Sequence, residues 1–353
     1  MRRTRVGCVV VLVVGATVAV LGGPAALAED QAQESERGSA GCGAEPPIAP
    51  GQSGSFSTRV GELNREWLLH LPPDYDSGVP VALVLDIHGY GGTAPSEEIY
   101  TGLSHHADRH GYAVVYPQAT GFEVGGRLVT SWNDLAGNAS PGPQGPICSD
   151  TADKYPNPPE CGDPTPCNWA TCHDDIAFMK QLLDRLESDL CVDLDRVYAT
   201  GMSNGGMFVH RLGCEMPERF AAIAPVGGTL ARGFNCAPEV PLAMMNIYGR
   251  DDDYVSQRGD MSSDGYYYLA AEAVMEKWAG AQQCAGETTV YETSRDGSLG
   301  LACIEHANCA NGVEVVHCAW DGPHEWPQAE GMPVGNDIIW EFFSKHSLSR
   351  DGE

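Results

Sequence analysis

The hydrophobic pattern of this chain consists mainly of short apolar runs separated by helical periods. Val81–Ile87 is a continuous apolar run of the kind that a buried central strand requires. In residues 174–190 the apolar side chains recur every three or four positions, which predicts a helix with one apolar face. The apolar-run pattern recurs in later segments, at Ala113–Tyr116, Arg196–Thr200, Ala221–Val226 and Ala243–Tyr248. Strands that alternate with helices predict an α/β fold with a mostly parallel sheet covered on both faces.

The two ends of this pattern differ from its middle. Ser55–Val60 and Arg65–Leu71 suit an opening hairpin that turns at Gly61 and Glu62. Toward the C-terminus the pattern predicts two strands and a last helix, near Thr289–Thr293, Val313–Trp320 and Asp337–His346. Because no repeat or tandem second domain is visible, we expect residues 42–348 to form one domain.

The first 28 residues have the form of a secretion signal. Three arginines near the start precede the short apolar run Val9–Leu21, and Ala26–Ala28 has the small-x-small form of a cleavage site. The alternative is a membrane anchor, but Gly22–Pro24 interrupts the apolar run before it could span a bilayer. We therefore predict cleavage and export, followed by a flexible leader over residues 29–41.

Cysteine usage agrees with an exported protein. The chain has 13 cysteines. Removal of Cys8 with the signal leaves an even number, which in an oxidising compartment predicts disulfides, most simply six. Residues 134–172 interrupt the strand and helix pattern and hold Cys148, Cys161, Cys167 and Cys172. We predict a disulfide-stapled insertion. The alternative is that these four cysteines bind zinc, although their spacing includes no C-x₂-C pair.

Charge and composition narrow the possible partners. The chain carries 21 Lys and Arg against 48 Asp and Glu, for a formal net charge of −27. This excess of negative charge argues against nucleic acid or an anionic membrane surface as a direct partner, and favours a neutral or cationic substrate. A hydrophobic content of 42% is typical of a globular rather than a disordered chain.

The most informative motif is the G-x-S-x-G sequence of Gly201–Gly205. It follows an apolar strand and precedes a helical segment that contains Phe208 and Leu212, which is the setting of a nucleophile elbow. The tight turn exposes the hydroxyl of Ser203, and the N-terminus of the next helix favours a negative oxygen there. The motif therefore predicts Ser203 as a catalytic nucleophile.

A serine nucleophile in acyl transfer also needs hydrogen-bond donors for the oxyanion. The backbone N–H of Asn204, the residue after the nucleophile, is one donor of this geometry. The second donor is expected in the glycine-rich loop that begins at His88, directly after Val81–Ile87. We assign it to the N–H of Tyr90.

The general base and the acid that orients it are expected after the serine. The strand Ala243–Tyr248 ends in three acids, Asp251, Asp252 and Asp253, and the residue pattern alone does not choose among them. Among the histidines that follow these acids, His324 lies on a loop after the last predicted strand, where a base is expected. Of the others, His317 lies in a predicted strand, His306 in a loop between cysteines, and His346 on the terminal helix.

Several of these segments together resemble secreted feruloyl esterases and the related polyhydroxybutyrate-depolymerase-like esterases. They are Arg196–Met207, Phe220–Val226, His88–Gly92, Ser131–Asn133 and His324–Pro327. The resemblance covers residues 42–346 and implies an α/β-hydrolase fold with a triad of Ser203, Asp252 and His324. The proposed chemistry needs no cofactor, and we predict no metal. The family's histidine and proline around the acid are Tyr248 and Asp253 here, so the acid could lie one position away.

The resemblance also implies a substrate class, namely esters of ferulate or related hydroxycinnamates on cell-wall polysaccharide such as xylan. Trp132 and Trp326 are expected to form an apolar wall for the acyl group, with burial in the core as the alternative for Trp132. Three other functions remain open: hydrolysis of polyhydroxybutyrate or acetylated xylan, a peptidase, and carbohydrate binding by an inactive esterase scaffold.

Overall fold

A computed structural model describes most of the chain after residue 37. The described residues are 38–134, 141–156, 158–162, 167, 169–234, 238, 240–295, 297–329 and 332–348. The predicted secretion signal and the predicted leader up to residue 37 lie outside them. Among the described residues, no helix has both the length and the apolar character needed to cross a membrane.

The last residues of the predicted leader are fixed to the domain. The backbone N–H of Ser39 donates to Val192 O at 2.8 Å, and that of Gly41 donates to Glu187 O at 2.9 Å. A Cβ on Gly41 would lie 2.4 Å from Leu190 O, so this close approach requires glycine. Cys42 then forms a disulfide with Cys191. The ordered domain therefore begins by residue 38 rather than at residue 42.

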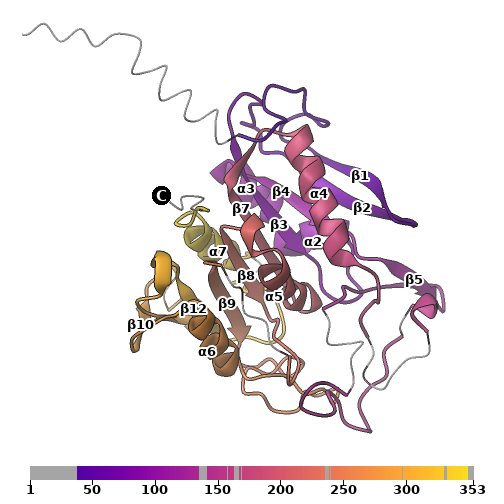
Figure 1. Ribbon diagram of the computed structural model, residues 1–353, viewed down its shortest axis with the longest axis vertical. Helices are drawn as coiled ribbons and strands as arrows, with labels where there is room; N and C mark the ends of the chain where they lie inside the picture. The colour runs from indigo at the N-terminus through magenta and orange to yellow at the C-terminus, as the bar shows by residue number, and fades with distance from the viewer. Residues whose placement is uncertain are drawn as a thin grey trace, which may run out of the picture.

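The fold is built on one mixed sheet of ten strands, with the order β1-β2-β4-β3-β7-β8-β9-β12-β11-β10 (Figure 1). The central strands β4, β3, β7, β8, β9 and β12 pair in parallel, and the strands at both edges pair antiparallel. Their bounds are β1 Ser53–Val60, β2 Leu63–His70, β3 Val81–Ile87, β4 Ala113–Pro117, β7 Val192–Met202, β8 Ala222–Val226, β9 Ala243–Gly249, β10 Thr288–Tyr291, β11 Ala302–His306 and β12 Val315–Trp320.

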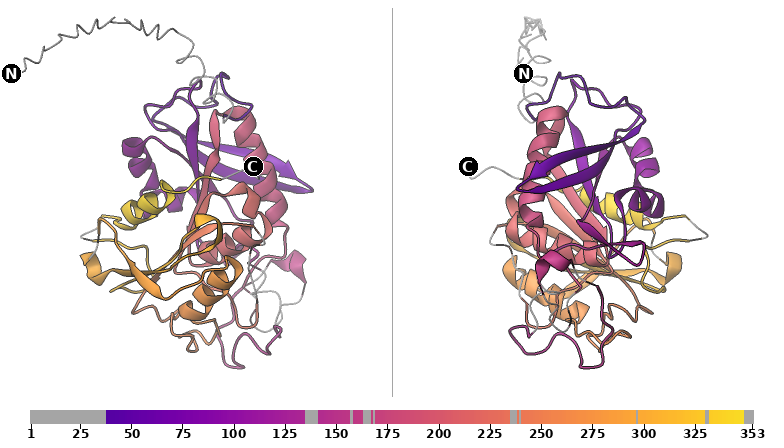
Figure 2. Two further views of the ribbon diagram at one scale, coloured as in Figure 1. Left: turned by 60° about the vertical axis from the view of Figure 1, so that its left-hand side comes forward. Right: turned by 90° about the vertical axis from the view of Figure 1, so that its right-hand side faces the viewer.

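Helices cover both faces of this sheet, as the two views of Figure 2 show. The helix bounds are α2 Ala94–Thr101, α3 Leu103–His110, α4 Asp175–Asp189, α5 Asn204–Glu215, α6 Ala271–Ala281 and α7 Gly335–Phe343. Apolar side chains of α4, α5 and α6 share one core with Leu83 and Leu85 of β3. Those of α2, α3 and α7 share a second core with Val84. Because β3 is buried on both faces, its residues are apolar except for Asp86.

The predicted parallel strands, opening hairpin, α4 and α7 are all present, with ends within a few residues of those predicted. The sequence analysis missed α2, α3, α6, the strand β11 and the small hairpin of β5 (Gly121–Val124) and β6 (Arg127–Thr130). In β11 only Cys303 is fully buried, so the strand has little apolar pattern to detect. The sequence signal for α2 was its N-cap residue, Thr93, whose side chain accepts a hydrogen bond from the backbone N–H of Ser96.

Disulfides connect parts of the chain that are far apart in sequence. The described pairs are Cys42–Cys191, Cys148–Cys167, Cys161–Cys172, Cys284–Cys309 and Cys303–Cys318. Cys214 is also disulfide-bonded, and Cys236 lies outside the described residues. The prediction that the chain carries disulfides is confirmed. All four cysteines of the 134–172 insertion are paired, so none is a free thiolate for zinc.

One acid interrupts the apolar sequence of β3. Asp86 is fully buried, and its Oδ2 accepts a hydrogen bond of 2.6 Å from the hydroxyl of Thr101 on α2. Glu97, on the same helix, is buried beside it. Burial disfavours the charged carboxylate and raises the pKa of Asp86 to about 8. Asp86 and Glu97 therefore stay protonated in the folded chain at a pH where the same carboxyl groups are ionised in the unfolded chain.

This retained proton predicts a pH dependence of stability. Since the folded-state pKa of Asp86 is raised, its contribution is complete below the unfolded pKa of about 4 and is lost as pH rises toward about 8. Asp86→Asn should therefore gain stability relative to the wild type between pH 5 and pH 8, by at most about 1.4 kcal/mol per pH unit. Urea unfolding at both pH values measures this difference. The exposed Glu62→Gln is the control, and an equal response of both variants would contradict the prediction.

Candidate active site

Ser203 lies on a strained turn between β7 and α5. Its backbone has φ 58° and ψ −120°, a region that costs free energy for a residue with a side chain. A Cβ on Gly201 would lie 2.5 Å from Ile87 O, and one on Gly205 only 1.9 Å from the same oxygen. The two glycines of the motif are therefore required because the turn presses against the end of β3.

The turn places the Ser203 hydroxyl at the start of a hydrogen-bonded chain. His324 Nε2 lies 2.8 Å from Ser203 Oγ, and His324 Nδ1 lies 2.6 Å from Asp252 Oδ2. This is the arrangement of nucleophile, base and orienting acid that acyl transfer requires. The structure thus brings together the three residues that the sequence analysis selected.

The structure distinguishes Asp252 from its two acidic neighbours. Asp252 is 2% exposed, whereas Asp251 and Asp253 are exposed to solvent. Its second carboxylate oxygen, Oδ1, accepts backbone N–H bonds from Tyr254 at 3.0 Å and Val255 at 2.7 Å. These bonds fix the carboxylate so that Oδ2 faces the imidazole. The residue pattern alone could not make this choice.

The loops that carry the acid and the base are bound to each other. The backbone N–H of Arg250 donates to Trp320 O at 2.8 Å, and that of Asp251 donates to Gly322 O at 3.0 Å. A Cβ on Gly249 would lie 2.3 Å from the carbonyl oxygens of Gly322 and Pro323. Glycine at position 249 therefore permits the contact that holds Asp252 against His324.

The two predicted oxyanion donors lie on either side of Ser203. Asn204 is the first residue of α5, so its backbone N–H has no acceptor within the helix. The loop of Tyr90 follows β3, and a Cβ on its neighbour Gly89 would lie 3.3 Å from Ser203 Cβ. Both segments are therefore next to the nucleophile, and the side chain of Tyr90 also lines the cavity described below.

His88 fixes the loop that carries Tyr90. Burial lowers the pKa of His88 to about 4, so the imidazole is neutral. Its Nε2 accepts the backbone N–H of Ala119 at 3.1 Å. Nδ1 therefore carries the proton and donates to Gly89 O at 2.8 Å. The imidazole holds the loop from within and is not positioned as a second base.

Trp132 joins this loop to the nucleophile turn. Its backbone N–H donates to Asn204 Oδ1 at 2.7 Å, and its carbonyl accepts from Asn204 Nδ2 at 3.2 Å. Its indole N–H donates to His88 O at 2.9 Å. Trp132 is fully buried and stacks on Phe208 at 5.2 Å. It lies in the core beneath the site rather than in the predicted wall for the acyl group.

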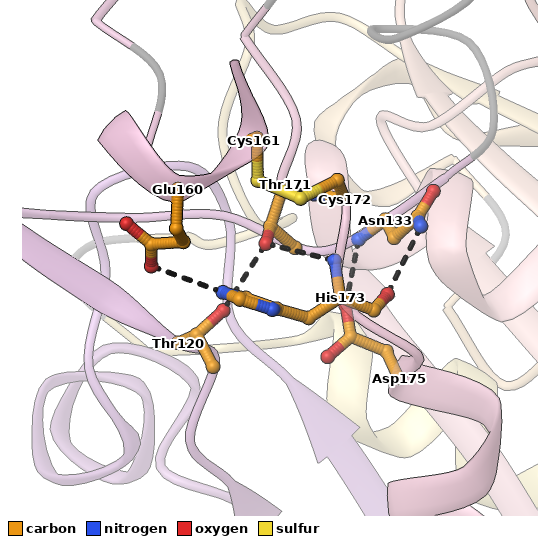
Figure 3. The surroundings of a disulfide bond; sticks show 8 residues. All are labelled: Thr120, Asn133, Glu160, Cys161, Thr171, Cys172, His173 and Asp175. Carbon is orange, nitrogen blue, oxygen red and sulfur yellow. Dashed lines mark hydrogen bonds and ion pairs between the residues drawn. A yellow bond between two sulfur atoms is a disulfide. The ribbon is translucent and has the colours of Figure 1, made fainter. Parts of the chain in front are cut away.

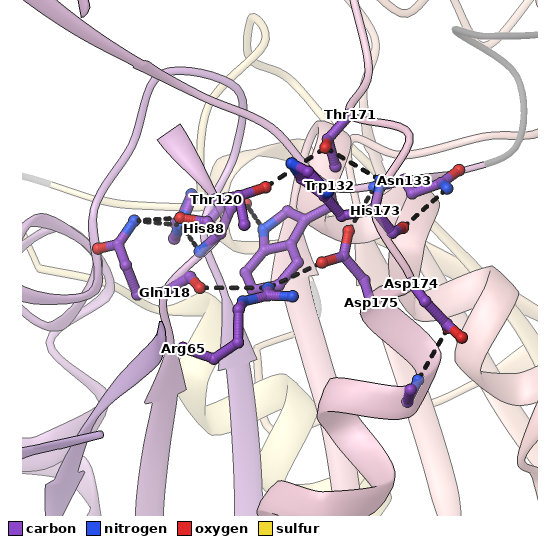
Figure 4. A network of polar contacts seen from close by, with 12 residues as sticks. Arg65, His88, Gln118, Thr120, Trp132, Asn133, Thr171, His173, Asp174 and Asp175 are labelled. Carbon is purple, nitrogen blue, oxygen red and sulfur yellow. Dashed lines mark hydrogen bonds and ion pairs between the residues drawn. The ribbon is translucent and has the colours of Figure 1, made fainter. Parts of the chain in front are cut away.

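A buried ion pair supports Trp132 from below. Arg65 Nη2 lies 2.7 Å from Asp175 Oδ1, and the guanidinium packs 4.0 Å over the Phe178 ring. Asp175 Oδ2 accepts the backbone N–H of Asn133 at 2.8 Å, as Figure 4 shows. The sequence analysis missed this pair. The alternation of β2 was the available signal, since Arg65 falls on the same face as the buried Trp67.

A cavity of about 200 Å³ opens beside Ser203 and His324. Its other lining residues are Tyr90, Tyr155, Trp169, Tyr254, Val255 and Asp264. The rings of Tyr155 and Trp169 lie edge-on to Tyr90, at 5.4 and 6.1 Å. The cavity therefore has an aromatic wall, but not from the residues predicted. Trp326 is buried, with its indole N–H bound to Asn336 Oδ1 at 2.9 Å.

Two of these aromatic residues, Tyr155 and Trp169, come from the 134–172 insertion. Figure 3 shows how its Cys161–Cys172 disulfide lies beside an ion pair between Glu160 and His173, whose atoms are 3.2 Å apart. The carbonyl of His173 accepts from the Asn133 side chain at 3.0 Å. The insertion is thus tied to the start of α4 and to the residue after Trp132.

Away from the triad, one group of described residues brings potential metal ligands close together. His106, His110 and Asp337 lie on α3 and α7, with ligand atoms within 4.8 Å of one another. Arg295 forms an ion pair with Asp337, and His106 Nδ1 lies 2.8 Å from the hydroxyl of Tyr112. Side chains of the same chain, Arg295 and Tyr112, therefore already contact this cluster. It is separate from the triad.

The sheet order, the strained serine turn and the hydrogen-bonded chain define an α/β-hydrolase. Solved structures agree: an acetyl xylan esterase from Aspergillus awamori has a TM-score of 0.50 at 16% identity, covering 83% of this chain and 99% of its own. The native structure of pOPH has a TM-score of 0.51 at 14% identity, covering 88% of this chain and 91% of its own. At these identities the likeness shows the fold.

The sequence relatives are more specific. A probable feruloyl esterase C of Aspergillus niger is 27% identical over 313 residues, which cover 86% of this chain and 90% of the relative. The feruloyl esterase C of Emericella nidulans is also 27% identical, with the same coverage. Feruloyl esterase B of Piromyces equi is 30% identical over 52% of this chain and 33% of its own length. No family model matches the sequence. The chain is a homologue of feruloyl esterases.

The buried position of Asp252 predicts unequal effects of the three acids. Asp252→Asn should lower kcat for any ester by about 10⁴-fold, because an amide in place of the carboxylate favours the wrong imidazole tautomer. Asp251→Asn and Asp253→Asn are the controls and should stay within about threefold of the wild type, because a surface change away from the site costs little. Steady-state hydrolysis of a chromogenic ester measures all three, and a greater loss in either control would reassign the acid.

The contact at Gly249 predicts a strong effect of a single methyl group. Gly249→Ala should lower activity by more than about tenfold and lower Tm, because the added carbon would push the loops of Asp252 and His324 apart. Gly280→Ala is the matched control: it lies in α6 with open space around its Cβ position, so alanine should raise stability slightly. Equal behaviour of the two variants in activity and thermal unfolding would contradict this role of Gly249.

Proposed function

We propose that this protein is a carboxylic ester hydrolase that releases hydroxycinnamic acids, such as ferulate, from plant cell-wall polysaccharide such as xylan. The observation that carries the proposal is the chain Ser203–His324–Asp252, which opens directly onto a small cavity with an aromatic wall. The homology to feruloyl esterases over 86% of the chain supports the same substrate class.

In the first half of the proposed reaction, Ser203 Oγ attacks the ester carbonyl. His324 Nε2, 2.8 Å away, takes the serine proton while Asp252 holds the opposite nitrogen. The carbonyl oxygen becomes negative, and the N–H groups of Tyr90 and Asn204 stabilise it together with the N-terminus of α5. His324 then gives its proton to the leaving alcohol, and the acyl group stays on Ser203.

In the second half, water takes the place of the alcohol. His324 removes a proton from this water, which attacks the acyl-enzyme carbonyl through the same oxyanion site. The intermediate collapses, and Ser203 recovers its proton as the acid leaves. Every proton transfer uses His324, and the proposal requires no cofactor.

We also propose that the enzyme acts outside the cell. The disulfides of the domain support this location, since structural disulfides persist in oxidising compartments. The predicted secretion signal at residues 1–28 supplies the route. The excess of negative charge favours a neutral ester as substrate over nucleic acid or an anionic membrane surface.

A panel of esters tests the function. Methyl ferulate should exceed methyl acetate in kcat/KM by about ten- to several-hundredfold, the range that an apolar pocket achieves. Trp169→Ala should reduce this ratio, because Trp169 lines the cavity, whereas Trp340→Ala should leave it unchanged. Trp340 is the matched control, since it packs on Tyr112 in the second core, with α2, α3 and α7. Ser203→Ala should abolish turnover of both esters.

The same panel separates the alternatives. Preference for hydroxybutyrate oligomers would favour a polyester depolymerase that uses the same triad. Preference for acetylated xylan would favour an acetyl esterase. Hydrolysis of none of these esters by correctly folded protein, together with binding to xylan, would favour the inactive carbohydrate-binding scaffold. Each of these results would overturn the hydroxycinnamate proposal.

A further inference from the structure

We propose that Asp264 binds the phenolic hydroxyl of the acyl group, so that the cavity beside Ser203 selects hydroxylated cinnamates. This inference rests on the proposed function and assigns a specific contact within the same pocket. Asp264 lines the cavity with Ser203 and His324, and it is the acidic residue of its wall. The family motifs in the sequence do not include it.

Neighbouring residues orient the Asp264 carboxylate. Its Oδ2 accepts a hydrogen bond of 2.8 Å from the hydroxyl of Tyr155, and its Oδ1 accepts one from the hydroxyl of Ser262. Ser262 Oγ in turn accepts the backbone N–H of Tyr266 at 2.7 Å. An ionised carboxylate has about four lone-pair sites. The two side-chain hydroxyls occupy two of them, which leaves acceptor capacity for a donor in the cavity.

The surroundings of Asp264 favour a ligand that brings a donor. Among the ion pairs of the described residues, none includes Asp264. The cavity wall around it is mainly aromatic, from Tyr90, Tyr155 and Trp169. Asp264 is half-buried, so its carboxylate can accept a charge-assisted hydrogen bond from a donor in the cavity.

The shape of the cavity favours a phenol over a sugar as this donor. A volume of about 200 Å³ suits one ring better than a polysaccharide segment. The edge-on arrangement of Tyr155 and Trp169 around Tyr90 suits another aromatic ring. A hydroxycinnamate esterified to Ser203 carries its hydroxyl at the opposite end of a flat, rigid group. A carboxylate in the same cavity is a suitable acceptor for it.

Four methyl esters test the inference, because their only hydroxyl groups are phenolic. Methyl p-coumarate and methyl ferulate carry the 4-hydroxyl, whereas methyl cinnamate lacks it and methyl 3,4-dimethoxycinnamate has it blocked. Asp264→Ala and Asp264→Asn should lower kcat/KM for the two hydroxylated esters by about ten- to hundredfold, the worth of a hydrogen bond to a charged group. The other two esters should change by less than about threefold.

Tyr155→Phe is the matched control for a purely structural role. It removes the hydrogen bond from Tyr155 to Asp264 but leaves the carboxylate in the cavity. If Asp264 acts only by holding the insertion, Tyr155→Phe and the Asp264 variants should lower turnover of all four esters alike. That result would overturn the inference. Retained selectivity for the hydroxylated esters in Tyr155→Phe, with loss of selectivity in the Asp264 variants, supports it.

The outcomes separate this inference from the proposed function. Wild-type protein that hydrolyses all four cinnamates, with Asp264 variants that keep the hydroxyl preference, would overturn the role of Asp264 and leave the hydroxycinnamate function intact. Wild-type protein that prefers hydroxybutyrate or acetate esters would overturn both. An Asp264→Asn effect on acetylcholine turnover in place of the hydroxylated esters would show that the carboxylate binds a cation, and would also overturn the inference.

Discussion

The contact between the Ser203 turn and the end of β3 constrains the rest of the active site. The strained backbone at Ser203 brings Gly201 and Gly205 so close to Ile87 O that no side chain fits at either position. The residues after Ile87 must then run beside the nucleophile, which places the loop of His88 and Tyr90 where a second oxyanion donor is needed. Trp132 binds both the turn and this loop, so a single packed unit carries Ser203 and both of the proposed oxyanion donors.

The parts of this site that sequence could predict are those that local backbone geometry requires. The glycines around Ser203, and His324 after the last parallel strand, leave a pattern within a few residues of themselves. The resemblance implied Asp252, but the residue pattern alone left three adjacent acids open, because burial and the N–H groups of Tyr254 and Val255 distinguish Asp252 only in the folded chain. Trp132 and Trp326 were misplaced because a tryptophan near a motif can face the core or the cavity, and only the folded chain decides between them.

The cavity wall was missed for a different reason. Tyr155 and Trp169 belong to an insertion without helical or strand periodicity, and long-range links determine their position. These include the Cys148–Cys167 disulfide and the bond from Tyr155 to Asp264. Figure 1 shows the insertion and the loop after β9 at the same end of the sheet. In this chain short loops at the ends of β7, β9 and β12 carry Ser203, Asp252 and His324, while loops held by disulfides and by hydrogen bonds line the cavity.

The same division has an electrostatic consequence for turnover. The ester substrate is neutral, but its acid product is an anion at neutral pH. The product carboxylate forms at Ser203, in the cavity that Asp264 also lines, on a chain with a formal net charge of −27. Like charges repel, so the net negative charge of the chain disfavours rebinding of the anionic acid relative to the neutral ester. The hydrogen bond that we propose for Asp264 lies at the other end of the acyl group and is the same in ester and acid, so any discrimination between them arises at the Ser203 end.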